Sequence, residues 1–196
     1  MDVAGGRYGF RPDRRRALGI AKGLMDVELR LAGCLVRSLR TTDAESMAAH
    51  ANDRRIWAQL RDRFPHPYSV ADAEFFIDLI NREDPCTTFA IVVDELCVGG
   101  IGLERQHDVH RLTAELGYWL GVDYWGRGIA TGAISAVTKW AFDALSLKRV
   151  FAQPFADNRG SCRALEKAGF TLEGTLRHSA IKDGVLRDQV MYARLS

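Results

Sequence analysis

Apolar residues follow a strand-like pattern over much of the chain. Short apolar or alternating runs of about four to eight residues, bounded by turn residues, are typical of strands. They occur at 34–39, 89–93, 96–103, 113–120 and 150–155, and on both sides of the pair Asp183-Gly184. Because that pair and Asp94-Glu95 each separate neighbouring runs by a tight turn, the pattern predicts two β-hairpins.

Other segments have the three- and four-residue apolar spacing of helices. One begins after the capping residues 42–45, one after Ser69 and one at Ile129, and a shorter one spans 161–168 and stops at Gly169. The expected buried faces are Val70, Phe75, Phe76, Leu79 and Ile80 in the second helix, and Ile129, Ala133, Val137, Trp140 and Ala144 in the third. The order of these elements predicts a single α/β domain whose sheet is mixed, largely antiparallel and flanked by helices.

Composition narrows the class of protein. A chain of 196 residues with 47% hydrophobic and 27% charged residues suits one globular domain. No apolar run approaches the roughly 20 residues that a membrane span needs. The four cysteines form no C-x-x-C pair and indicate neither a zinc site nor a disulfide framework. We therefore expect a cytoplasmic protein with no metal and no membrane contact.

The start of the chain is basic. Residues 1–24 carry six basic and two acidic side chains, a net charge of +4, so the remainder carries −2. Such an arm could contact RNA or a ribosome. A flexible extension, or sequence upstream of a true start at Met25, explains it equally well, and we favour these two readings. We assign residues 1–28 to a basic extension and 29–196 to the domain.

One expected strand-to-helix junction carries candidate chemistry. Gly126 and Gly128 lack Cβ atoms, so the surrounding backbone N–H groups can approach an anion closely. A helix that begins at Ile129 adds unpaired N–H donors and the positive end of its dipole. The turn consists of Trp125, Gly126, Arg127, Gly128, Ile129, Ala130 and Thr131. It predicts a site for a phosphorylated cofactor, although glycines also shape turns that bind nothing.

Three further segments accompany this turn: 115–120 before it, and 157–161 and 165–170 after it. In this order the four segments resemble the GNAT superfamily of acetyl-CoA-dependent N-acetyltransferases, and within it the RimJ/RimL-like branch that acetylates ribosomal-protein N-termini. The resemblance covers roughly residues 35–195. It implies a GNAT-like sheet, acetyl-CoA as co-substrate, and direct transfer to a primary amine without a covalent enzyme intermediate.

The resemblance also implies where acetyl-CoA binds. The backbone of residues 125–131 would hold the pyrophosphate, with Arg127 adding charge. A bulge would splay the strand 115–120 from the strand 150–155, and pantetheine would lie in the gap. The residues that would line the pantetheine are Trp119, Leu120, Gly121, Val122, Asn158 and Ser161. The alternative role of Asn158 and Ser161 is helix capping.

Catalysis requires an uncharged amine, whereas an α-amine has a pKa of about 7.7–8.0. A proton acceptor is therefore needed, and Glu115 is the candidate, acting directly or through water. The alternative is that Glu115 is a salt-bridged strand residue. Leu165 stands where many small-amine GNAT enzymes carry a tyrosine acid. Ser161 is then the candidate to hydrogen-bond the departing sulfur, and we expect Tyr118 and Tyr192 to pack in the core.

The acceptor remains open at this stage. The first hypothesis is a protein or peptide N-terminal amine, and the second is a small amine such as a polyamine, an amino acid or an aminoglycoside. A third, of another class, is a non-catalytic acyl-CoA-binding or ribosome-associated protein. Glu115 and Ser161 favour an enzyme over the third hypothesis. A homodimer is an expectation from family habit alone.

Overall fold

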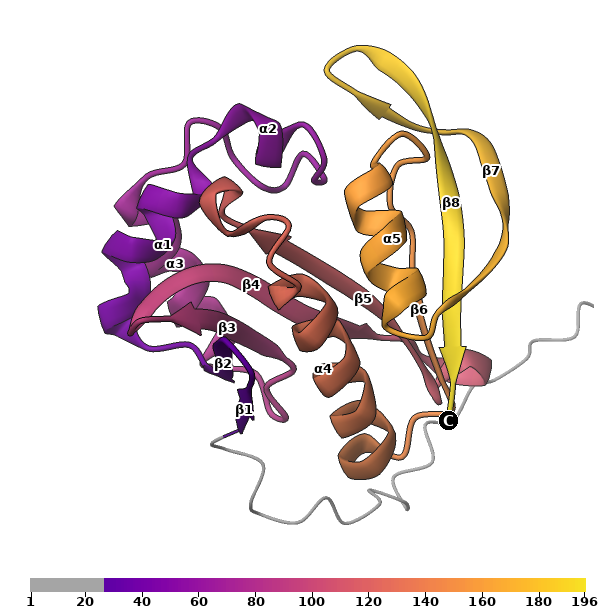
Figure 1. Cartoon of the computed structure of the whole chain (residues 1–196), viewed down its shortest axis with the longest axis horizontal. Coiled ribbons are helices and arrows are strands. Elements are labelled where there is room, and N and C mark those ends of the chain that lie inside the picture. Colours follow the sequence, from indigo (N-terminus) through magenta and orange to yellow (C-terminus); the bar gives the residue numbers. More distant parts are fainter. Residues whose placement is uncertain (1–26) are drawn as a thin grey trace, which may run out of the picture.

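A computed structural model describes residues 27–196 as one eight-stranded sheet covered by helices (Figure 1). The strand order is β1-β2-β3-β4-β5-β6-β8-β7, and only β5 and β6 pair in parallel. The strands are β1 (Glu28–Leu31), β2 (Cys34–Ser38), β3 (Thr88–Val93), β4 (Leu96–Arg105), β5 (Thr113–Leu120), β6 (Arg149–Ala152), β7 (Thr171–Lys182) and β8 (Val185–Leu195). The expected mixed, largely antiparallel sheet is confirmed.

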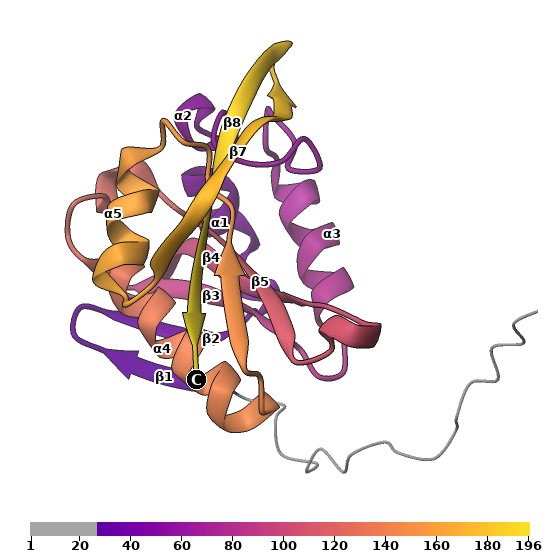
Figure 2. The same cartoon turned by 90° about the vertical axis from the view of Figure 1, so that its right-hand side faces the viewer.

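Helices cover both faces of this sheet. They are α1 (Ala44–Ala51), α2 (Arg54–Trp57), α3 (Val70–Ile80), α4 (Ile129–Leu145) and α5 (Arg159–Lys167), with 3-10 turns η1 (Thr41–Asp43), η2 (Asp108–His110) and η3 (Val122–Tyr124). α4 and α5 lie on one face, and α3 lies on the other (Figure 2). None of the helices within residues 27–196 is long and apolar enough to cross a membrane.

Both expected hairpins are present. Asp94 and Glu95 between β3 and β4 have φ of 47° and 68°, and Asp183 and Gly184 between β7 and β8 have φ of 53° and 75°. Positive φ at both central residues is the signature of the tight turn whose twist matches that of paired strands. The Asp-Gly pair therefore fixes the register of the long C-terminal hairpin.

Alternating side chains of the central strands build two cores. Phe89 and Ile91 of β3 join the larger core under α4 and α5, whereas Ala90 and Val92 join the smaller core under α1 and α3. This division follows from the two-residue period of a strand. A buried ion pair between Arg37 and Asp43, with guanidinium-to-carboxylate distances of 2.7 Å, ties the end of β2 to η1.

Two helix faces differ from the sequence-based expectation. In α3 the buried residues are Ala73, Ile77 and Ile80, while Phe75 is 72% exposed. The stripe that packs includes the small Ala73, which the apolar count overlooked. In α4, Ala144 lies exposed in the last turn, and Ala141 is buried instead.

The described residues begin just before the domain boundary that we assigned. The extension 1–28 lies outside them except for its last two residues. Val27 is 8% exposed and packs in the larger core, and Glu28 opens β1. Folded structure is therefore already present at residue 27.

Candidate active site

The turn before α4 has the backbone that its glycines predicted. Gly126 and Gly128 have φ of 76° and 79°, in the left-handed region that favours glycine. Gly128 is the N-cap residue of α4, and no side chain caps the helix. The first N–H groups of an α-helix have no partner within the helix. The start of α4 therefore presents backbone donors, and a Cβ built on either glycine meets no atom within 4 Å.

Aromatic contacts hold this turn against the end of β5. The Trp125 indole N–H donates to the Leu120 carbonyl at 2.7 Å, although half of the Trp125 side chain is exposed. The exposed Arg127 guanidinium carbon lies 5.2 Å from the centre of the Tyr124 ring. Arg127 thus adds positive charge at the mouth of the turn, while Trp125 fixes the position of the turn relative to the sheet.

The sheet opens between β5 and β6, next to this turn. Only residues 113–115 of β5 pair with β6, whereas β5 continues to Leu120 and β6 ends at Ala152. The expected bulge in β5 is wrong, because its register with β4 is uninterrupted from Ala114 to Leu120. The strands separate instead because β6 stops just before Pro154, whose ring nitrogen cannot donate to a neighbouring strand.

One backbone donor of the expected pantetheine segment is already engaged. The Gly121 N–H donates to the Val98 carbonyl at 2.7 Å, so Gly121 faces β4 and not the gap. Among the described residues, the Leu120 carbonyl accepts the Trp125 indole. Polar backbone groups of Trp119 and Val122 are therefore the better candidates for contact with a ligand in the gap.

On the α4–α5 side of the gap, Ser161 meets Tyr118. Asn158 is the N-cap residue of α5, and its side chain accepts the Ser161 N–H at 3.1 Å, so the expected capping role is confirmed. The Ser161 and Tyr118 hydroxyl oxygens lie 2.6 Å apart. Burial raises the pKa of Tyr118 to about 12, although the bond to Ser161 opposes the shift. Tyr118 therefore packs in the core as expected and also contacts a candidate site residue.

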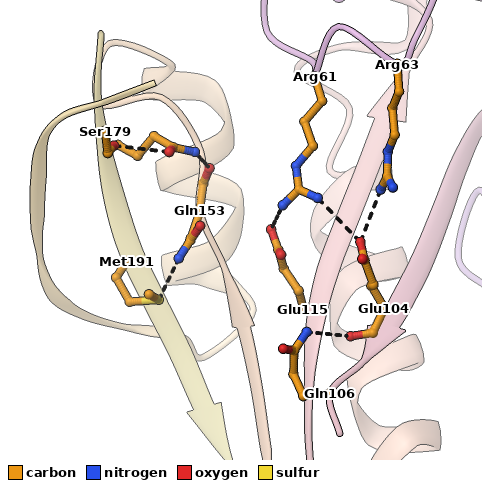
Figure 3. Close-up of polar contacts among 9 residues, drawn as sticks. Arg61, Arg63, Glu104, Gln106, Glu115, Gln153, Ser179 and Met191 are labelled. Carbon is orange, nitrogen blue, oxygen red and sulfur yellow. Dashed lines mark hydrogen bonds and ion pairs between the residues drawn. The ribbon is translucent and has the colours of Figure 1, made fainter. Parts of the chain in front are cut away.

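Glu115 lies on the opposite side of β5. Its carboxylate is 18% exposed and forms an ion pair with Arg61, which also approaches Glu104 at 3.4 Å (Figure 3). Glu104 and Glu115 are direct cross-strand partners, a repulsive arrangement that Arg61 and Arg63 neutralise. Burial lowers the pKa of Arg61, but the hydrogen bond and charge of Glu115, with the charge of Glu104, leave it raised. The salt-bridged reading of Glu115 is confirmed.

A cavity of about 210 Å³ opens beside Glu115. Its lining combines α2-side, β6-side and hairpin residues: Leu60, Arg61, Asp62, Gln153, Phe155, Ala180, Ile181, Lys182 and Gln189. In Figure 3, Gln153 and Ser179 lie across from Arg61. Gln189 bridges them, because it donates to the Gln153 carbonyl and accepts from the Ser179 hydroxyl.

The β7–β8 hairpin anchors the far wall of this cavity. The Lys182 ammonium lies 2.8 Å from Asp62 and 3.8 Å from the centre of the Trp57 ring. Arg187 donates to the Ala58 carbonyl at 2.8 Å. Nothing in the sequence marked Arg61, Lys182 or Arg187 as site residues, because their partners lie up to 129 positions away.

The candidate catalytic residues thus lie on the two faces of one strand. Glu115 and Tyr118 are three positions apart on β5, so their side chains project to opposite faces. Glu115 meets Arg61 beside the cavity, and Tyr118 meets Ser161 on the helix side. The structure brings Ser161 to Tyr118 and does not bring Glu115 into contact with Ser161. The gap between β5 and β6 is the passage between the two faces.

Comparisons with known proteins agree with this architecture. Residues 34–171 match the acetyltransferase (GNAT) domain model. Among curated proteins, Probable N-acetyltransferase YjcK of Bacillus subtilis is 42% identical over 168 residues, covering 82% of this chain and 93% of the relative. The ribosomal-protein-serine acetyltransferase of Escherichia coli is 30% identical over 60% of this chain and 65% of its own length.

A relative with a different substrate and a solved structure complete the picture. The spermidine N(1)-acetyltransferase of Escherichia coli is 28% identical over 72% of this chain and 73% of its own length. Mycobacterium smegmatis RimJ in complex with CoA-disulfide has the same fold, with a TM-score of 0.76 and 24% identity over 87% of each chain.

Proposed function

The chain belongs to the GNAT family of N-acetyltransferases, and from this premise we propose that it transfers acetyl from acetyl-CoA directly to the α-amine of a protein or peptide N-terminus. The observation that carries the proposal is the opening of the sheet between β5 and β6. An uncapped helix start lies on one side of the opening, and a carboxylate beside a cavity lies on the other.

The residues present suit a pyrophosphate at the start of α4. The open space before Gly126 and Gly128 leaves room for phosphate oxygens, and uncapped N–H groups at a helix start favour anions. In our proposal the backbone of residues 125–131 binds the pyrophosphate and Arg127 adds charge. Trp119, Val122 and Asn158 then border the pantetheine arm in the gap.

Proton handling follows from the placement of two side chains. Glu115 receives the amine proton directly or through water, and Arg61 holds its carboxylate in place. Ser161 donates a hydrogen bond to the departing sulfur from the helix side. A CoA thiol with a pKa near that of cysteine, about 8.5, leaves readily as the thiolate, so a strong acid is not required.

Charge at the cavity supports a peptide over a polycation. Arg61 and Lys182 contribute two positive charges to the lining, against one negative charge from Asp62. The amides of Gln153 and Gln189 can donate to and accept from peptide groups. The ribosomal-protein-serine relative supports the same acceptor class, whereas the spermidine relative favours a second candidate, a small-molecule amine.

The test is acetyl-CoA turnover, measured by thiol release, against N-terminal peptides and small amines, with calorimetric acetyl-CoA binding on the same sample. Turnover of peptides alone supports the proposal. Turnover of spermidine or another small amine alone moves the assignment to the second candidate. Tight acetyl-CoA binding without turnover of either class refutes the proposed activity and favours a non-catalytic acyl-CoA-binding protein.

A further inference from the structure

The contact between Tyr118 and Ser161 joins two elements that need not otherwise meet. Tyr118 comes from β5 and Ser161 from the first turn of α5, 43 positions later, and their hydroxyl oxygens are 2.6 Å apart. Both side chains are partly buried. At this distance the two hydroxyls share one proton in a well-formed hydrogen bond.

The direction of this bond decides what Ser161 can do. A serine hydroxyl has one proton to donate and two lone pairs that accept. Among the described residues, Tyr118 is the partner of the Ser161 hydroxyl. If Ser161 donates to Tyr118, no proton remains for another acceptor. If Tyr118 donates, the Ser161 proton is free to turn into the gap.

The chemistry of the two hydroxyls favours the second arrangement. A phenol is the stronger acid of the two and therefore the better donor. Resting on the function proposed above, we propose that Tyr118 is a positioning residue: its phenol donates to Ser161 and so turns the Ser161 hydroxyl proton toward the departing sulfur. The amine nitrogen bonds to the acetyl carbon, the carbon–sulfur bond breaks, and the electron pair leaves on sulfur.

Tyr118 does not serve as the proton source itself. Burial raises the pKa of Tyr118 to about 12, against about 8.5 for a thiol of the cysteine type. Net transfer from this phenol to a thiolate is unfavourable by about three orders of magnitude. Tyr118 thus keeps its proton through the working pH range, and its donated bond keeps one direction.

The experiment is a double-mutant cycle of Tyr118→Phe and Ser161→Ala, read as kcat, acetyl-CoA Kd and thermal midpoint. Tyr118→Phe removes one hydroxyl from a side chain that otherwise packs unchanged. We expect kcat to fall about tenfold, the worth of one hydrogen bond, with Kd within twofold of wild type. In the Ser161→Ala background, Tyr118→Phe should lower kcat no further.

Tyr192→Phe is the matched control. Its hydroxyl also donates to a side chain of α5, Glu166, at 2.7 Å, so it tests the general loss of a tyrosine contact with that helix. It should leave kcat within twofold. Multiplying effects of Tyr118→Phe and Ser161→Ala on kcat, or an unchanged kcat in either single variant, would overturn the inference. Absence of turnover by the wild type with every amine would instead refute the proposed function.

Discussion

Gly128→Ala tests the proposed pyrophosphate site with little damage to the fold. At a φ of 79°, a residue with a Cβ costs about 1–2 kcal/mol relative to glycine. No clash adds to this cost, because a Cβ at this position meets no atom of the chain within 4 Å. For a domain of this size the thermal midpoint should fall by about 2–8 °C.

The effect on the ligand should be larger than the effect on the fold. A methyl group in the open space before α4 would keep a phosphate oxygen from a backbone N–H. Loss of one hydrogen bond to a charged group costs about 1.5–3 kcal/mol, which weakens the acetyl-CoA Kd about ten- to 150-fold. Calorimetric titration of acetyl-CoA measures this directly. S-acetylpantetheine, which lacks the pyrophosphate, should be used equally well by variant and wild type.

Gly33→Ala is the matched control for backbone strain. Gly33 lies in the β1–β2 turn with a φ of 90°, and its added Cβ also meets nothing within 4 Å. It should lose similar stability and keep the wild-type Kd. The reasoning fails if Gly128→Ala keeps its acetyl-CoA Kd within twofold of wild type, or if both variants weaken it equally.

Three further predictions follow from named contacts. Glu115→Gln should lower kcat about 100-fold or more with acetyl-CoA KM within twofold, and equal loss of both or of neither rejects Glu115 as base. Since the folded-state pKa of Tyr118 is about 12 and the unfolded value about 10, its contribution to stability is complete below pH 10 and declines from there to pH 12. Alkaline denaturation should show less of this decline in Tyr118→Phe. Arg37→Met leaves the buried Asp43 carboxylate unpaired and should cost about 3–5 kcal/mol in urea unfolding, partly recovered by adding Asp43→Asn; a cost below 1 kcal/mol contradicts this.

Local patterns carried much of the fold and the first part of the site. The hairpin turns were predictable because Asp94-Glu95 and Asp183-Gly184 lie between apolar runs at the spacing that tight turns need. Gly126 and Gly128 were predictable because positive φ and the absence of a Cβ are properties of glycine itself. Asn158 was recognisable as a cap because capping acts within one helical turn.

What the sequence by itself determined, then, is the order of elements, the anion-binding turn and the candidate residues Glu115 and Ser161. Only the tertiary structure decided how these parts meet: the opening where β6 ends, the ion pair of Glu115 with Arg61, and the bond of Ser161 to Tyr118. Local periodicity reports on neighbours a few positions apart. These contacts join residues 43 and 54 positions apart, and only the packing of strands and helices brings them together.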